Sequence, residues 1–250
     1  MESLYTLEKK NHEQEQELNQ ERLRFYTNIT HELRTPLTLI LGPLEDMQKE
    51  TSLPVKQAQK LSVIHQSALR LLNLINQILE FRKTETQNKK LCVSKGNIAP
   101  LIYEIGLKYK ELNQKTKIDF QIQIEKEEML LFFDKEIITI VLDNLISNAI
   151  KYTEQGRVTL SLYQTMRNEV AYTEIKVSDT GYGISAEALP HIFDRYYQES
   201  GKHQASGTGI GLALVKNLVT LHEGEIRAES MQNEGSTFYI SLLTDNIYPN

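Results

Sequence analysis

Apolar residues near the start of the chain recur at helical spacing. Steps of three and four residues connect Ile29, Leu33, Leu37, Ile40, Leu44 and Met47. This spacing predicts one buried face of a helix. At about 100° per residue, His31 lies roughly opposite Ile29 and Leu33, so we expect it to point at solvent or at a partner.

A second apolar seam follows a predicted break near Pro54. The residue before a proline avoids helical geometry, and Pro54 can begin the next helix. The seam consists of Leu61, Ile64, Ala68, Leu71, Ile75 and Ile78, with Leu72 and Leu79 beside it. This apolar face is wider than one partner helix requires, so we expect a homodimer in which two helical hairpins form a four-helix bundle.

Short strands and helices are predicted to alternate after a polar linker at 84–90. The expected strands are 91–93, 118–124, 129–132, 157–163, 172–178, 224–229 and 237–243, the last two paired. The expected helices are 98–114, opened by Asn97 and Pro100, 134–150, capped by Asp134, and 213–221. Helices on one face of a mixed sheet make a two-layer α/β sandwich, so the whole chain is expected to be an α+β protein.

These patterns divide the chain into three regions, 1–24, 25–88 and 89–250. The first is polar, and Leu4, Leu7, Leu18 and Phe25 fit a heptad whose other core positions are polar. It is either a weak coiled coil that runs into the first helix or a solvated, partly frayed helix. The second region is the hairpin, and the third is the sandwich.

Composition narrows the function classes. The 250 residues are 40% hydrophobic and 24% charged with a net charge of −5, which argues against a nucleic-acid surface. The single cysteine, Cys92, excludes an intramolecular disulfide, fits a reducing cytosol and is expected to be a small core residue. The chain has no apolar run long enough to span a membrane and no signal peptide at its N-terminus.

His31 is the first candidate for chemistry. Thr35 lies one turn further on nearly the same helical face, and Pro36 is expected to kink the helix just after this pair. A proline inside a helix costs about 3 kcal/mol, which suggests a local shape worth keeping, although a surface histidine is the simplest alternative. His65 is the rival nucleophile but lacks the adjacent glutamate and proline, and we expect surface positions for His12, His191, His203 and His222.

The continuous stretch 28–37, which reads Asn-Ile-Thr-His-Glu-Leu-Arg-Thr-Pro-Leu, resembles the phosphoacceptor box of the sensor histidine kinases of two-component signalling. The resemblance implies that His31 takes a phosphoryl group from ATP. Glu32 is placed to hold or accept the proton of the other ring nitrogen. The resemblance also implies that Thr35 positions a water for the reverse, phosphatase, reaction. It further implies that the segment before residue 25 carries a signal from a sensor.

Two candidate nucleotide motifs lie in the third region. Asn144 and Asn148 are four residues apart on one helical face, and their amide oxygens suit Mg²⁺, while Lys151 can supply a phosphate counter-charge. The alternative for the asparagines is hydrogen bonding to nearby backbone. At a strand end, Asp179 can accept the adenine amino group while Gly181 and Gly183 let the backbone approach the base, unless the motif is only a turn.

Two further motifs follow. The stretch 185–206 reads as a lid that orders on nucleotide, with Arg195 as a phosphate contact or, alternatively, a surface ion pair. Glycines that open the next helix leave N–H groups for an anion. The glycine-rich stretch spans residues 207–212. We assign to nucleotide binding all of its residues except Ile210, namely Gly207, Thr208, Gly209, Gly211 and Leu212.

Together and in this order, the four motifs resemble the N, first-glycine, phenylalanine-bearing and second-glycine boxes of the histidine-kinase ATP domain, whose fold type II topoisomerases and mismatch-repair ATPases share. The resemblance covers about residues 25–245 and implies ATP and Mg²⁺ as ligands. It places Asn148 and Asn144 near Mg²⁺ and Asp179 on adenine. It also places Lys151, Tyr152 and Arg195 along the nucleotide, with the glycines shaping the pocket.

The expected function is therefore autophosphorylation of His31 and transfer to an aspartate of a response-regulator receiver. The alternatives are a dimeric scaffold that binds nucleotide, or a regulator that acts mainly as a phosphatase; a topoisomerase-type ATPase does not suit the acidic charge and the hairpin. Since the family usually has a membrane-spanning sensor upstream, we expect a cytoplasmic location, as part of a membrane-anchored sensor. The sequence around His31 is also similar to that of hybrid kinases, which carry a receiver after the ATP domain. The sequence does not decide whether the phosphoryl group is transferred within one subunit or between the two subunits of the dimer.

Overall fold

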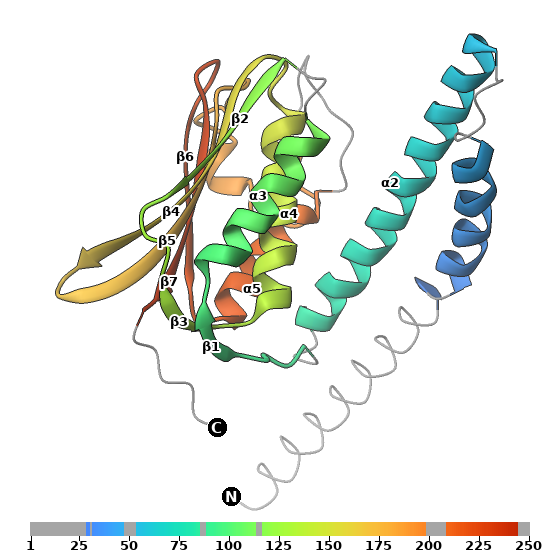
Figure 1. Cartoon of the computed structure of the whole chain (residues 1–250). Helices are drawn as coiled ribbons and strands as arrows, with labels where there is room; N and C mark the ends of the chain where they lie inside the picture. Colours follow the sequence, from blue (N-terminus) through green and yellow to red (C-terminus); the bar gives the residue numbers. More distant parts are fainter. Residues whose placement is uncertain are drawn as a thin grey trace, which may run out of the picture. The chain divides into compact units, whose positions relative to one another are not determined.

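A computed structural model gives the structure of the protein and describes residues 29–30, 32–47, 54–85, 89–113, 117–198 and 209–244. The chain divides into two compact units, Met1–Lys89 and Lys90–Asn250. The described residues of the first unit are almost all helical, and the second unit combines helices with strands (Figure 1).

The first unit contains a helical hairpin. Residues 29–30 and 32–47 are helical, and α2 spans Val55–Glu85 after Pro54, as the proline signal predicted. A small core of Leu37, Leu41, Ala68 and Ile75, with Leu72 against it, joins the two helices. Arg34 adds a polar link, because its Nη2 donates to Asn76 Oδ1 at 2.7 Å.

Only part of the predicted apolar face is buried within one hairpin. Leu61 and Leu79 are also buried, whereas Ile40 and Leu71 are each 50% exposed. The exposed apolar residues on the two predicted seams are Leu33, Ile40, Met47, Ile64 and Leu71. Their steps of seven residues along each helix describe a second stripe, which one hairpin leaves in solvent.

The second unit is built on a five-stranded sheet of order β2-β4-β5-β7-β6. Its strands are β2 (Ile118–Ile124), β4 (Gly156–Arg167), β5 (Val170–Asp179), β6 (Glu225–Met231) and β7 (Gly235–Leu243). Strands β2 and β4 are parallel and the other pairs antiparallel, so the sheet is mixed, as predicted. A separate two-stranded sheet pairs β1 (Ser94–Asn97) with β3 (Leu130–Phe133).

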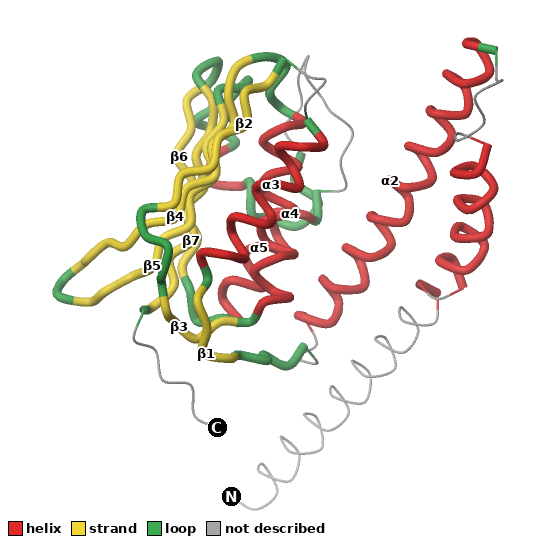
Figure 2. The backbone as a smooth tube through the Cα atoms, viewed as in Figure 1, coloured by secondary structure: helices red, strands yellow, loops and turns green. Residues whose placement is uncertain are grey.

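Three helices cover one face of this sheet (Figure 2). They are α3 (Ala99–Leu112), α4 (Lys135–Lys151) and α5 (Gly211–Leu221), and a short 3₁₀ helix, η1, spans Leu189–His191. Strand residues such as Leu160 and Ile175, and helical residues such as Leu142 and Leu218, are fully buried. The predicted two-layer sandwich is therefore confirmed, and both of its layers contribute buried apolar side chains.

Asp134 begins α4 as predicted and ties three segments together. Its Oδ1 accepts from Ile137 N at 3.0 Å, which caps the helix. Its Oδ2 accepts from Cys92 N at 2.8 Å, and its own N–H donates to His222 Nε2 at 3.0 Å. The start of the second unit and the end of α5 thus meet at the first turn of α4.

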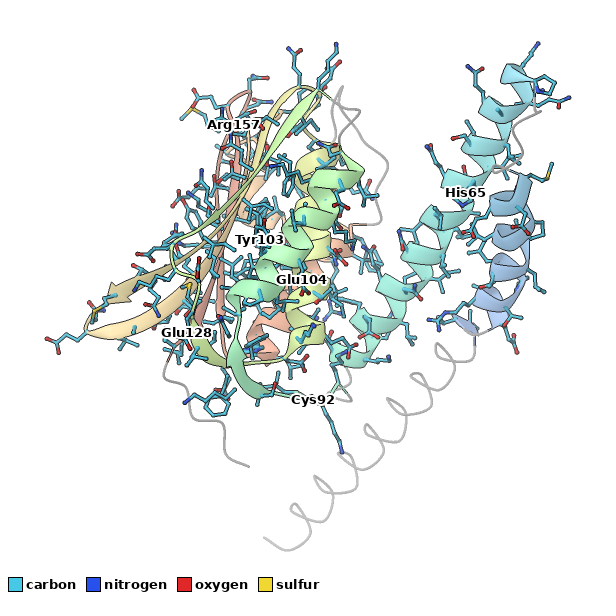
Figure 3. The ribbon with its side chains drawn as sticks, viewed as in Figure 1. His65, Cys92, Tyr103, Glu104, Glu128 and Arg157 are labelled. Atoms are coloured by element: carbon cyan, nitrogen blue, oxygen red, sulfur yellow. The ribbon has the colours of Figure 1, made fainter. Side chains whose placement is uncertain are left out.

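Two predictions near Asp134 are wrong. Residues 91–93 are not a strand, because β1 begins at Ser94, and the side chain of Cys92 is exposed rather than in the core (Figure 3). The apolar residues 91–93 suggested a strand, but the Cys92 backbone N–H donates to the Asp134 carboxylate instead of to a neighbouring strand. His222, expected at the surface, is only 2% exposed, since its ring accepts the Asp134 N–H inside the fold.

The other histidines and the central hairpin complete the comparison. His191 is exposed as predicted, whereas His12 and His203 lie outside the described residues. Strands β4 and β5 are longer than predicted and extend as a hairpin beyond the rest of the sheet (Figure 1). Asn168 and Glu169 make its turn with positive φ angles of 50° and 67°.

Candidate functional site: the Asp179 loop framed by α4 and the β6–β7 turn

The phosphoacceptor stretch lies in the first unit. His31 is outside the described residues, so its orientation stays a prediction; Glu32 and Thr35, which are described, have exposed side chains. Pro36 lies inside the helix formed by residues 32–47, and its predicted kink also stays a prediction. Residues 29–30 and 32–37 of this stretch are helical, and Arg34 is directed at Asn76 across the hairpin.

The rival His65 occupies a different environment. Its side chain is 16% exposed, and Nε2 lies 3.6 Å from Glu45 Oε1 (Figure 3). Among the described residues this nitrogen is buried and has no hydrogen-bond partner. In-line attack on phosphorus needs a nitrogen that the nucleotide can reach, so His65 remains the weaker candidate.

The two asparagines of α4 differ in their surroundings. Asn144 is 8% exposed and its Nδ2 donates to Ile140 O at 2.8 Å, which is the backbone interaction weighed as the alternative for this pair. Asn148 is half-buried one turn later. Asn148 is therefore the better placed of the two to present an amide oxygen to a ligand.

The C-terminal end of α4 meets the glycine loop that follows β5. Tyr152 caps the helix, and its carbonyl oxygen accepts from Tyr182 N at 3.1 Å. A Cβ at Gly181 would lie 2.2 Å from this oxygen, so only glycine permits the approach. Beside it, Lys151 Nζ donates to Tyr152 Oη at 3.1 Å and lies 4.6 Å from the ring centroid. The structure thus brings Lys151, Tyr152 and Gly181 together.

Asp179 ends β5 with its carboxylate held in place. Oδ1 accepts from Gly181 N at 2.9 Å and from Ser236 N at 3.3 Å. Burial raises the pKa of this carboxyl, and the two backbone N–H groups act in the opposite direction by favouring the ionised form. A fixed, partly buried carboxylate can accept hydrogen bonds from an amino group and so discriminate between bases.

The sequence reading missed the second wall of this loop, which is the β6–β7 turn. Asn233 N donates to Tyr182 O at 2.7 Å, and Ile184 N donates to Ser230 Oγ at 2.8 Å. A Cβ at Gly183 would lie 2.0 Å from Met231 O, so this contact also requires glycine. The strand pattern carried no signal for it, because it follows from β7 pairing with β5, which sets Ser236 opposite Asp179.

The remaining predicted residues lie around the N-terminus of α5. Gly211 begins α5, Leu212 follows it, and Gly209 O accepts from Tyr196 N at 2.9 Å, next to the exposed Arg195. This bond joins the phenylalanine-bearing and second-glycine motifs. The described residues do not include the second half of the predicted lid, residues 199–206, or Gly207 and Thr208.

Family comparisons agree with both halves of the chain. Residues 21–87 match the family model of the His Kinase A (phospho-acceptor) domain. Residues 133–246 match the model of the histidine kinase-, DNA gyrase B- and HSP90-like ATPases, which supports an ATP site in the second unit. The chain belongs to the sensor histidine kinases of two-component systems.

Individual relatives place this segment within longer proteins. Histidine kinase P4 of Formosa agariphila is 37% identical over 96% of this chain, which corresponds to 17% of that protein. The sensor histidine kinase WalK of Bacillus subtilis is 31% identical over 92% of this chain and 38% of its own length. The chain thus spans less than half of either relative.

A solved structure supports the fold. Full-length ShkA in complex with AMPPNP superposes with a TM-score of 0.69 at 24% identity, over 87% of this chain and 45% of that one. As for membrane insertion, none of the helices in the described ranges is both long and apolar enough to cross a bilayer.

Proposed function

We propose that this chain binds ATP in the second unit and transfers its γ-phosphoryl group to His31 in the first. The observation that carries the proposal is the Asp179 loop, which is fixed between the end of α4 and the β6–β7 turn. The same chain carries the His-Glu-Leu-Arg-Thr-Pro stretch. A nucleotide site and a phosphoacceptor in one segment are the two components of autophosphorylation.

The roles of the residues follow from their chemistry. A ring nitrogen of His31 attacks the γ-phosphorus in line, the bond from this phosphorus to the β,γ-bridging oxygen breaks, and ADP leaves. Glu32 holds or accepts the proton on the other ring nitrogen and keeps the attacking one basic. Asp179 accepts the adenine amino group. Lys151 and Arg195 offset the phosphate charge, and the backbone N–H groups from Gly207 to Leu212 receive the phosphates.

The amide oxygen of Asn148, with a lesser contribution from Asn144, is the proposed protein ligand of Mg²⁺. The described residues contain no cluster of three or more histidine, cysteine or acidic side chains able to hold a metal ion. One or two amide oxygens suit Mg²⁺, because this ion keeps several waters and is usually bound through few protein ligands together with substrate phosphates. When bound, the ion neutralises charge on the transferring phosphoryl group.

The proposed assembly is a homodimer through the hairpins. The exposed stripe that includes Ile40 and Leu71 supports it, because contiguous exposed apolar side chains mark interaction surfaces. The proposed recipient of the phosphoryl group is an aspartate of a response-regulator receiver. Thr35, exposed on the helix that carries the phosphoacceptor stretch, is proposed to orient a water for the phosphatase reaction, in which the receiver phosphate is hydrolysed to inorganic phosphate. The location we propose is cytoplasmic, as part of a membrane-anchored sensor.

Incubation with γ-labelled ATP and Mg²⁺ tests the proposal. We expect acid-labile, base-stable label on the wild-type chain and none on the His31→Gln variant, because glutamine cannot form a phosphoramidate through a ring nitrogen. Label of this kind on His31→Gln would contradict the assignment of the nucleophile. Nucleotide binding without phosphohistidine in the wild type would favour the scaffold alternative.

A further inference from the structure

The hydroxyl of Ser230 occupies a central position behind the nucleotide loop. Ser230 lies on β6 and is half-buried. Its Oγ accepts from Ile184 N at 2.8 Å, donates to Gly235 O at 2.8 Å and lies 3.0 Å from Ser236 Oγ. A carbonyl can only accept, so the single Ser230 proton is directed at Gly235, and the Ser236 hydroxyl must be the donor to Ser230.

Ser230 therefore uses its one donor and both acceptor positions, and each bond reaches a part of the site. Ile184 closes the loop that begins at Asp179. Gly235 packs directly on Asp179, since a Cβ there would lie 2.0 Å from Asp179 O. Ser236 provides the second backbone N–H to the Asp179 carboxylate, at 3.3 Å.

We infer that Ser230 is a positioning residue for adenine recognition, which acts by holding the Asp179 loop against the β6–β7 turn. The inference rests on the proposed function, because it assumes that Asp179 accepts the adenine amino group. Ser230 need not touch the nucleotide. It fixes both ends of the segment that orients the carboxylate, and a polar group discriminates between ligands only when its position is fixed.

The inference predicts a loss of discrimination as well as a loss of affinity. In Ser230→Ala, the Kd for ATP should rise about tenfold, as for the loss of a buried hydrogen-bonded group. Purine riboside triphosphate lacks the 6-amino group and gains nothing from Asp179, so its Kd should change much less. The preference for ATP over this analogue should therefore fall about as much as the ATP affinity does.

Direct binding measurements by isothermal titration calorimetry on the whole chain test this. Ser178→Ala is the matched control, because Ser178 directly precedes Asp179 in the chain. Among the interactions described, the Ser178 hydroxyl bonds only Thr237 Oγ1, at 3.0 Å. That variant should keep the wild-type preference. Ser236→Ala removes the hydroxyl donor to Ser230 but keeps the backbone N–H to Asp179, so a smaller shift in the same direction is expected.

A second measurement, amide hydrogen exchange, reports directly whether the Asp179 loop is held less firmly in the variant. Amide hydrogen exchange over residues 181–184 of the nucleotide-free protein should be faster in Ser230→Ala and unchanged in Ser178→Ala. An equal loss of affinity for both nucleotides, or an unchanged ATP preference in Ser230→Ala and Ser236→Ala, would overturn the inference and leave the proposed function standing. A wild-type chain that binds both nucleotides equally would overturn the role of Asp179 and the inference with it.

Discussion

The two units bury their apolar residues to different extents. In the sandwich unit, core side chains such as Ile146, Leu160 and Ile175 have no exposed surface. In the hairpin unit, half of the surface of Ile40 and Leu71 is exposed although both lie on a predicted seam. A two-layer fold covers its own apolar face, whereas two helices cannot. The sandwich is thus a complete fold, and the hairpin has an apolar surface suited to a second copy.

The largest expected effect comes from placing charge on the exposed stripe. The double substitution Ile40→Glu with Leu71→Glu should weaken dimerisation on the order of 100-fold or more, because charges would be buried without partners. Autophosphorylation should fall with it, while ATP affinity stays at the wild-type value. Analytical ultracentrifugation measures the first effect, and calorimetric titration with ATP measures the last.

Leu39 offers a control for this experiment. It is 70% exposed but lies about 100° around the helix from Ile40, away from the stripe. Leu39→Glu should leave the dimer intact. A dimer that survives the double substitution, or one that Leu39→Glu dissociates equally well, would mean that the exposed stripe is not the interface.

The complementary change acts on the sandwich alone. Asp179→Asn keeps the shape of the side chain but replaces one carboxylate oxygen with an amide donor, so the Kd for ATP should rise roughly 10- to 100-fold from the loss of one buried polar interaction. The dimer should persist, because the hairpin is untouched. Titration calorimetry and ultracentrifugation on the same sample would separate the two properties. An unchanged affinity would remove Asp179 from the nucleotide site.

The smallest expected effect is a pH dependence confined to the sandwich. Burial lowers the pKa of His222 below its usual 6.5, with the Asp134 and Glu223 carboxylates acting in the opposite direction. Below pH 6.5 the unfolded chain therefore binds a proton that the folded one does not. Stability should be fully present above that pH and fall as the pH drops toward the folded-state pKa.

The slope from His222 is at most about 1.4 kcal/mol per pH unit for one proton. His222→Gln should flatten the dependence of the sandwich Tm on pH between about 7 and 5, as followed by calorimetry. The contribution of Asp179 has the opposite sign, because its raised pKa stabilises the fold as the pH falls from that raised value toward 3.8. An equal slope in the variant would mean that His222 is not responsible.

Periodicity predicted most of the fold because burial is what sets it. The strand at Ile118–Ile124 and the helix capped by Asp134 match their predicted positions, since each has a one-sided apolar pattern or a capping side chain. Cys92 and His222 were misplaced for the same physical reason. Each is governed by a hydrogen bond to Asp134 that no local pattern encodes.

The sequence motifs of the site could be predicted, but the residues that hold the Asp179 loop in place could not. The Asp-x-Gly-x-Gly stretch identified the loop, and Gly181 and Gly183 do meet backbone that excludes a Cβ. Ser230 and Ser236 went unnoticed, because their roles follow from strand pairing. The pairing of β5 with β7 sets Ser236 opposite Asp179, 57 positions away, and the pairing of β6 with β7 sets Ser230 opposite Ser236. The sequence of a single strand does not show which residues of another strand will pair with it.

Mapping the phosphoryl group by tandem mass spectrometry, without exposure to acid, tests the central claim most directly. After incubation of the wild-type chain with ATP and Mg²⁺, we predict phosphate on the peptide that contains His31 and none on the peptide that contains His65. The same reaction with Asp179→Asn, at an ATP concentration near the wild-type Kd, should yield much less of the modified peptide. Phosphate on His65, or an undiminished yield from Asp179→Asn, would contradict the account.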